Sequence, residues 1–276
     1  MMDDTIDLQR INAGRTATIF KCTDHQVLKL FRSTFPEHGI DEEYKIGTYL
    51  YNLGLDIPRT YARMHFEGSH GIVFEYIPGQ SMLQKLASAP WKVFSYAKQM
   101  ARLHWKIHST RISDAAEIPS IKESLTSKIL RVRLLTSFEK ATIISHLSTL
   151  KKGNAICHGD FHPDNIIVST DRLVTVDWLT ERIGNPIADV ARTWLLLTMG
   201  TLPDHKTAFE NMLAKYLRDT FCRAYVSEYR RLSNFESSEF DKWKLPVAAA
   251  RLIENVSDQE NENLLKWIRM KLQKDH

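Results

Sequence analysis

The first eighty residues alternate short apolar runs with polar breaks. Residues 7–31 contain two runs of β-forming residues, ATIF and QVLKLF, and the polar break at Thr23–His25 lies between them. A further run, GIVFEYI (71–77), ends at Pro78–Gly79. Short runs bounded by turn-forming residues predict β-strands, so we expect a small sheet in this part of the chain.

Between these strands, apolar residues recur at the spacing of one helix face over residues 41–53, and Gly54 follows where a helix commonly ends. The rest of the chain carries mainly helical patterns, over residues 91–108, 118–150, 187–199, 205–231 and 245–272. We therefore expect an α+β protein with a small β-rich lobe over residues 1–77 and a larger α-helical lobe over 78–276.

One segment, CHGDFHPDNIIVSTDRLVTVDW, interrupts the helical patterns with many polar residues. It contains two apolar runs, 165–168 and 173–176, with a polar, turn-like stretch between them, and so predicts an antiparallel hairpin. If the hairpin is centred on residue 171, Asn165 and Asp177 lie opposite each other on one face, about 5 Å apart at Cα.

Oxygen ligands paired in this way suit Mg²⁺, so Asn165 and Asp177 are candidate metal ligands. Asp160 comes five residues before Asn165, on a loop that Pro163 stiffens. A carboxylate beside a metal site can accept a proton from an incoming hydroxyl group, which is an arrangement that phosphoryl transfer uses. The alternative is that these Asp and Asn residues only cap turns at the hairpin ends.

Composition and charge are those of an ordinary globular protein. The chain has 276 residues, of which 43% are hydrophobic and 25% are charged. Lys and Arg number 37 against 33 for Asp and Glu, and we find no basic run of the kind that marks a nucleic-acid or membrane-surface patch. We therefore expect neither nucleic acid nor a membrane as a partner.

The three cysteines, Cys22, Cys157 and Cys222, are far apart and show no CxxC spacing. A disulfide framework or a zinc site is therefore not expected, and a reducing cytoplasm is the predicted location. The N-terminal MMDDTIDLQR lacks the basic and apolar regions of a signal peptide. The longest apolar stretch, near residues 194–199, is too short to cross a bilayer.

The motif HGDFHPDN followed by VDW resembles the catalytic loop and metal motif of the aminoglycoside phosphotransferase and choline kinase superfamily, which is related to protein kinases. The resemblance implies a bilobal, protein-kinase-like fold with ATP and Mg²⁺ as cofactors. It implies that Asp160 is the catalytic base and that Asn165 and Asp177 bind Mg²⁺. Asp189, in the family's spacing, would brace the catalytic loop from the start of a helix.

The family also uses a strand lysine that contacts the nucleotide phosphates and a helix glutamate that holds it. Lys29 lies within the apolar run VLKLF and is the candidate lysine, although a strand lysine that extends to solvent is the alternative. Glu43 is preferred over Glu42 as its partner, because the family's glutamate comes eleven residues before the turn glycine, here Gly54. The alternative for Glu43 is a favourable acid in a first helical turn.

The strand GIVFEYIPG resembles the family's hinge, so backbone groups of Glu75 and Ile77 are expected to bind adenine, with the hinge at about residues 75–79. A single glycine, Gly14, stands where the family has its phosphate-covering loop. The sequence therefore leaves open which backbone amides contact the phosphates.

Three functions share these motifs. The first is an ATP-dependent phosphotransferase that acts on a hydroxyl group of a small molecule, as a monomer or homodimer. A protein-directed kinase and a nucleotide-binding pseudokinase are the alternatives. The short segment after Asp177 argues against a large protein substrate. Residues 110–150 and 200–276 are expected to select the acceptor, whose identity the motifs do not reveal.

Two further patterns have competing interpretations. His104 and His108 are four residues apart, which would suit a zinc site, but the glutamate of a zinc-protease motif is absent, and we interpret both as core residues near the catalytic loop. Acidic residues in the C-terminal stretch could form a wall for a cationic acceptor, or could simply be solvated, which is the preferred interpretation: Glu254, Asp258, Glu260 and Glu262.

Overall fold

The structure is a computed structural model that describes residues 8–14, 16–66, 68–110, 118–180, 182–200, 207–254 and 256–274. The predicted strand start at residue 7 and the predicted helix start at residue 205 lie outside the described residues. So do residues 111–117 and 201–206 of the segments expected to select the acceptor.

The chain forms two compact units. The first contains the described residues up to Gln84 together with Asp164–Leu179, and the second contains the described residues of Lys85–Pro163 and those from Thr180 onward. The lobe boundary expected at residues 77–78 stays a prediction. Among the described residues, no helix combines the length and the apolar composition needed to cross a bilayer.

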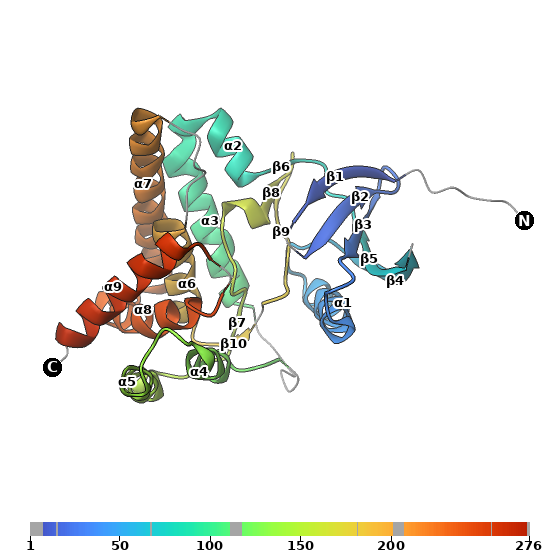
Figure 1. Cartoon of the computed structure of the whole chain (residues 1–276). Helices are drawn as coiled ribbons and strands as arrows, with labels where there is room; N and C mark the ends of the chain where they lie inside the picture. Colours follow the sequence, from blue (N-terminus) through green and yellow to red (C-terminus); the bar gives the residue numbers. More distant parts are fainter. Residues whose placement is uncertain are drawn as a thin grey trace, which may run out of the picture. The chain divides into compact units, whose positions relative to one another are not determined.

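The first unit contains a five-stranded antiparallel sheet with the strand order β1-β2-β3-β5-β4 (Figure 1). Its strands are β1 (Gln9–Ala13), β2 (Ala17–Lys21), β3 (Gln26–Phe31), β4 (Thr60–Phe66) and β5 (Ser69–Glu75). α1 (Glu37–Asn52) packs on β4 and β5, over a core that includes Phe31, Ile40 and Ile72. The pattern did not predict β4 because most of its side chains are exposed at the edge of the sheet.

A second, three-stranded sheet of the first unit has the order β6-β8-β9. It consists of β6 (Gln80–Ser81), β8 (Ile166–Val168) and β9 (Leu173–Thr175), and the short 3₁₀-helix η2 (Pro163–Asn165) precedes β8. The predicted hairpin therefore exists. It brings Asp177 into the same unit as Lys29, although the two residues are 148 positions apart in the sequence.

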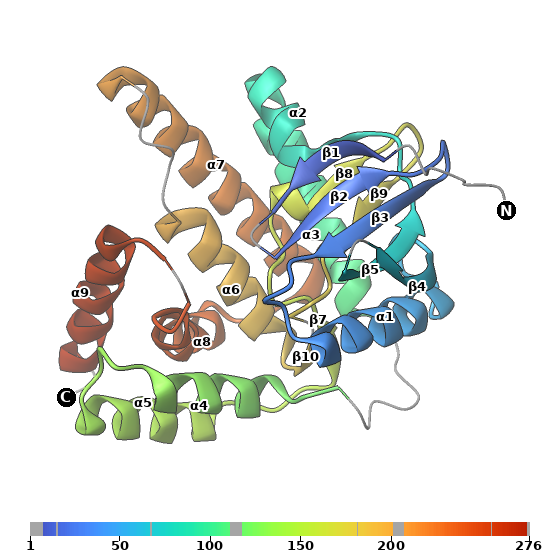
Figure 2. The same cartoon turned by 45° about the vertical axis from the view of Figure 1, so that its right-hand side comes forward.

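The second unit is mainly helical, and α2 (Met82–Ser88) carries the chain into it. Its other elements are η1 (Pro90–Lys92), α3 (Val93–His108), α4 (Ile121–Arg131), α5 (Ser137–Thr149), α6 (Pro186–Met199), α7 (Ala208–Ser233), α8 (Ser237–Arg251), α9 (Asp258–Lys274) and the antiparallel pair β7 (Ala155–Cys157) and β10 (Arg182–Gly184). α3 and α7 pack side by side, and α4 and α5 both contact α8 (Figures 1 and 2).

Two of the predicted helical stretches are each divided into two helices. Residues 118–150 form α4 and α5, and the side chain of Thr136 starts α5 by accepting a hydrogen bond from the backbone N–H of Glu139. Residues 245–272 fall partly in α8, which begins eight residues earlier, and partly in α9. Helical periodicity continues across both breaks, so it could not reveal them.

Candidate active site

Lys29 lies at the centre of an ionic cluster in the first unit. β3 buries the residue to 8% exposure, between neighbouring strands β2 and β5. Its Nζ lies 2.6 Å from Oε1 of Glu43 and 2.8 Å from Oδ1 of Asp177. A buried ammonium group requires compensation of its charge, and these two carboxylates provide it.

The two carboxylates also determine the charge of the lysine. Burial by itself would lower the pKa of Lys29, but the negative charges of Glu43 and Asp177 outweigh burial and raise it. Lys29 is therefore protonated at neutral pH. The partner from α1 is Glu43, which is buried, whereas Glu42 is exposed.

The expected register of the hairpin is wrong by one residue. β8 and β9 pair Ile166 with Thr175, and one step further the backbone N–H of Val176 donates to the carbonyl of Asn165. Asn165 therefore lies opposite Val176, not opposite Asp177. The four-residue turn, 169–172, places the centre of the hairpin between residues 170 and 171, so a centre at residue 171 is half a residue too far along the chain.

Asp177 leaves the strand in a conformation that is unusual for a residue other than glycine. Its φ of 65° lies in the left-handed region. Strained backbone of this kind is concentrated at functional sites. Despite the shifted register, Asn165 and Asp177 both line one cavity of about 600 Å³, together with Lys29 and Glu43.

Glu75 and Ile77 also line this cavity. The backbone N–H of Glu75 donates to the carbonyl of Arg59, and the N–H of Tyr76 donates to the carbonyl of His25. A ligand at this edge could therefore use the carbonyl of Glu75 but not its N–H. The expected contact between the backbone of Glu75 and adenine is thereby limited to the carbonyl oxygen of Glu75.

Gly14 also lines the cavity, but its N–H donates to the carbonyl of Ala17, and its own carbonyl accepts from Arg32. The N–H group that a phosphate could use is thus already bonded within the turn. This observation excludes Gly14 as a simple amide donor in the conformation described.

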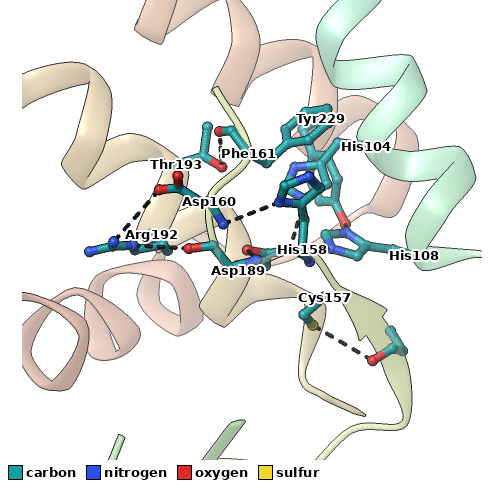
Figure 3. A network of polar contacts seen from close by, with 12 residues as sticks. His104, His108, Cys157, His158, Asp160, Phe161, Asp189, Arg192, Thr193 and Tyr229 are labelled. Carbon is teal, nitrogen blue, oxygen red and sulfur yellow. Dashed lines mark hydrogen bonds and ion pairs between the residues drawn. The ribbon is translucent and has the colours of Figure 1, made fainter. Parts of the chain in front are cut away.

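Asp160 belongs to the second unit, on the loop that follows β7 (Figure 3). Its Oδ2 lies 3.4 Å from Nε2 of His162, and its Oδ1 lies 3.7 Å from a guanidinium nitrogen of Arg192. Burial by itself would raise the pKa of Asp160, but the hydrogen bond from His162 and the charge of Arg192 lower it overall. The carboxylate is therefore ionised at neutral pH.

Asp189, in the first turn of α6, holds the backbone of this loop (Figure 3). Its carboxylate accepts the N–H of His158 at 2.5 Å and the N–H of Gly159 at 2.9 Å. The predicted brace from the start of a helix is confirmed. Gly159 has a φ of 77°, and a Cβ added there would lie 2.4 Å from the carbonyl oxygen of Thr180, so the loop requires glycine at this position.

Two histidines complete the environment of Asp189. Nε2 of His104 and Nε2 of His108 lie 3.1 and 3.3 Å from Oδ2 of Asp189. Their Nδ1 atoms lie 2.6 Å from the hydroxyl groups of Tyr225 and Tyr229. Because a carboxylate only accepts, the Nε2 of each histidine donates its hydrogen to Asp189.

This arrangement bears on the zinc alternative. His104, His108 and Asp189 are close enough to share a metal ion. However, both nitrogens of each imidazole already have a hydrogen-bond partner, and all three side chains are fully buried. Burial lowers the pKa of His104 to about 3, so this imidazole is neutral. Hydrogen bonds within the core therefore explain why these three residues lie together, in line with the interpretation of the two histidines as core residues.

The four acidic residues of the C-terminal stretch do not behave as one group, either as a wall for a cationic acceptor or as solvated residues. Glu254 accepts from Arg192 at 2.8 Å, and Glu260 is buried and bonded to Arg251 at 2.9 Å. Asp258 and Glu262 are exposed. Two of the four residues therefore belong to a buried ionic network, and two face solvent.

Sequence reasoning missed several members of these networks. Arg192 lies one helical turn after Asp189, a spacing that places both on one face of α6. Tyr225 and Tyr229 repeat the four-residue spacing of His104 and His108, and that match was a usable signal. Arg251 and Lys128 gave no signal, because an isolated cation on a helix is usually solvated.

Comparisons with known proteins agree with this geometry. A model of the phosphotransferase enzyme family matches residues 7–234, which is most of the chain. A search of curated protein sequences found no match.

Several solved structures resemble the chain at low sequence identity. An aminoglycoside-3'-phosphotransferase of type VIII is 17% identical, with a TM-score of 0.61 over 91% of each chain. The choline kinase LicA from Streptococcus pneumoniae is 16% identical, with a TM-score of 0.59 over 95% of this chain and 93% of its own. The amicoumacin kinase hAmiN, in complex with AMP-PNP, Ca²⁺ and Ami, is 14% identical, with a TM-score of 0.59 over 95% and 86%. These likenesses confirm the predicted α+β, kinase-like fold.

Proposed function

Because the chain belongs to the phosphotransferase enzyme family, we propose that it transfers the γ-phosphate of ATP to a hydroxyl group of a small molecule. The observation that carries this proposal is the position of Lys29 between Glu43 and Asp177, at 2.6 and 2.8 Å, in a cavity of about 600 Å³. A lysine held by a glutamate and placed beside a metal-binding aspartate is the arrangement that kinases use for phosphates.

The residues of the cavity fit a nucleotide with Mg²⁺. Asn165 offers an amide oxygen and Asp177 a carboxylate, and Mg²⁺ prefers oxygen ligands of these kinds. Bound Mg²⁺ would supply charge neutralisation on the phosphates. Lys29 would bind phosphate oxygens, and Glu43 would orient Lys29. At the hinge, the carbonyl of Glu75 would accept from the adenine amino group, and the N–H of Ile77 would donate to a ring nitrogen.

Asp160 is the proposed base. The carboxylate is ionised at neutral pH, because His162 and Arg192 together keep its pKa below the usual range despite burial. Asp189 holds the adjacent backbone, so the loop that carries Asp160 is fixed. Asp160 would accept a hydrogen bond from the acceptor hydroxyl and take its proton as the phosphoryl group transfers.

A small-molecule acceptor is favoured by the names of the similar structures, which include kinases of aminoglycosides and choline. Only eight residues separate Asp177 from the start of α6 at Pro186, which leaves little chain for a protein-binding activation segment. A cytoplasmic location stays a prediction, as does the choice between monomer and homodimer.

The test uses the full chain with labelled ATP, Mg²⁺ and a panel of hydroxyl compounds. We expect Asp160→Asn to lower turnover about 10²- to 10⁴-fold with little change in nucleotide affinity. Asp171→Asn, which makes the same change at the exposed hairpin turn, should leave turnover unchanged. Unchanged turnover in Asp160→Asn would reject the assigned base.

The metal assignment needs a separate measurement. We expect Asp177→Asn to lose Mg²⁺-dependent nucleotide binding, measured by calorimetry with a non-hydrolysable ATP analogue. A normal Mg²⁺ titration in this variant would count against Asp177 as a ligand. Labelled bands after incubation with cell lysate would favour a protein-directed kinase, and absence of any turnover with intact nucleotide binding would favour a pseudokinase.

A further inference from the structure

A dense group of charged side chains lies next to Asp160 in the second unit. It draws on four separate elements, α4, β10, α6 and the segment from the end of α8 to the start of α9. We call it the Glu254 cluster, and its members are Lys128, Arg182, Arg192, Arg251, Glu254 and Glu260. Its composition bears on which acceptors the site can hold.

Both carboxylates of the cluster accept hydrogen bonds from arginines. Glu254 accepts from Arg192 at 2.8 Å and also from Arg251. Glu260, at 6% exposure, accepts from Arg251 at 2.9 Å. Each carboxylate is already bonded to a guanidinium group, whose positive charge offsets the attraction that a cationic ligand would feel.

Lys128 lies farther from its carboxylate partner than Arg192 and Arg251 lie from theirs. Its Nζ lies 3.7 Å from Oε1 of Glu254, which is beyond hydrogen-bond distance. Burial and the positive charges of Arg192 and Arg182 lower the pKa of Lys128, although Glu254 opposes them. An anion bound at Lys128 would relieve this unfavourable environment.

The cluster reaches the proposed base directly. The guanidinium nitrogen of Arg192 that bonds Glu254 also lies 3.7 Å from Oδ1 of Asp160. Among the described residues, a series of ion pairs through Glu254 and Arg192 links Lys128 to Asp160. An acceptor whose hydroxyl group meets Asp160 has the Glu254 cluster as its neighbour.

The charges of this region do not suit a polycation. Among the described residues, the cluster and Asp160 contribute four cations, Lys128, Arg182, Arg192 and Arg251, against three carboxylates. Among these described residues, cations therefore outnumber carboxylates by one. Like charges brought together in a partly buried site repel each other strongly.

We propose that the acceptor carries an anionic group, either a carboxylate or a phosphate ester, and that Lys128 binds this group while the acceptor hydroxyl meets Asp160. The inference rests on the proposed function, since it names the acceptor class of the same site. It replaces the idea of an acidic wall for a cationic acceptor, because Glu254 and Glu260 are already paired.

The experiment measures binding of small hydroxyl compounds to the full chain in the presence of Mg²⁺ and AMP-PNP, by calorimetry. The probes share a glycerol-sized skeleton: glycerol 3-phosphate, glycerate and uncharged glycerol, with choline as the cationic probe. We expect glycerol 3-phosphate or glycerate to bind more tightly than glycerol and choline, and the comparison between the two anions distinguishes phosphate from carboxylate recognition.

Variants locate the anion. We expect Lys128→Gln to weaken anion binding about 10- to 100-fold, because a charge-assisted hydrogen bond is lost. Lys128→Arg should retain binding. Lys266→Gln, which removes one positive charge from an exposed position on α9, should bind like the unmodified chain. Thermal unfolding checks that each variant is folded. If Lys128→Gln does not fold, Lys128→Arg tests whether a positive charge at this position is sufficient for anion binding.

Several results would overturn the inference. These are preferred binding of choline, anion binding that Lys128→Gln does not weaken, or no binding of either anion at millimolar concentrations. AMP-PNP binding and the slow hydrolysis of ATP by water are measured on the same samples. If both are present, the proposed function stands while the inference about the acceptor fails. If both are absent, the proposed function itself fails.

Discussion

The two units of the molecule use buried polar groups in opposite ways. In the first unit, Lys29 is charged and is shared between Glu43 and Asp177 at the wall of a cavity. In the second unit, Asp189 is the charged group, but its partners are two histidines and two backbone N–H groups, and the three side chains are fully buried.

This difference separates a binding site from a scaffold. Every hydrogen-bonding atom of the imidazoles around Asp189 has an internal partner, so nothing remains for a ligand to use. By contrast, Asp177 faces the cavity with 42% of its side chain exposed. Complete internal pairing is thus the property of the structural network, and charged groups shared at a cavity wall are the property of the proposed ligand site.

The largest expected effect is on the structural network. Asp189→Asn replaces an acceptor of four hydrogen bonds with an amide whose NH₂ group would face other donors. We expect the free energy of unfolding to fall by about 3–5 kcal/mol, measured by urea denaturation. Asp171→Asn at the exposed turn is the control, and equal stability of the two variants would contradict the role of Asp189 as a brace.

The next largest expected effect is a loss of nucleotide affinity in the first unit. Lys29→Met leaves Glu43 and Asp177 close together without a cation. We expect affinity for the nucleotide to fall about 10- to 100-fold, because charge-assisted bonds to the phosphates are lost. Fluorescent-nucleotide titration measures this loss. Lys21→Met, on the neighbouring strand, removes a solvent-exposed pair with Asp24 and should bind nucleotide normally; the proposed role of Lys29 fails if both variants bind alike.

The smallest expected effect is a dependence of stability on pH, which arises from the buried network around Asp189. His104 has a pKa of about 3 in the folded chain because burial disfavours its charged form, whereas an unfolded histidine titrates near 6.5. The unfolded state therefore binds more protons between these values, so stability falls on acidification. From pH 7 to pH 5 we expect a loss of about 2 kcal/mol from this group.

The pH dependence is measured by urea denaturation across that range. His104→Phe cannot titrate, so its stability should change less with pH, whatever its absolute stability. His25→Gln, at an exposed position, should keep the full slope. A slope in His104→Phe equal to that of the unmodified chain would show that His104 does not remain neutral in the fold.

Local sequence was sufficient for the hairpin and for its turn. The runs at 165–168 and 173–176 predicted the strands because apolar residues and β-formers act locally. These runs also leave a turn of four residues, and the length of a turn sets which residues pair. That turn places Asn165 opposite Val176, so the pairing of Asn165 with Asp177 was wrong because a centre at residue 171 does not fit the predicted runs.

By itself, the sequence determined the fold class, the hairpin, and the brace at Asp189, because short-range periodicity and the spacing of the motif carry that information. The motif also indicated Glu43 as the partner of Lys29, but the tertiary structure alone decided the other charge pairs. Lys29 and Asp177 are 148 positions apart, and Glu254 joins Arg192 from a distant helix end. Pairing of this kind depends on how helices and strands pack, and no local pattern encodes it.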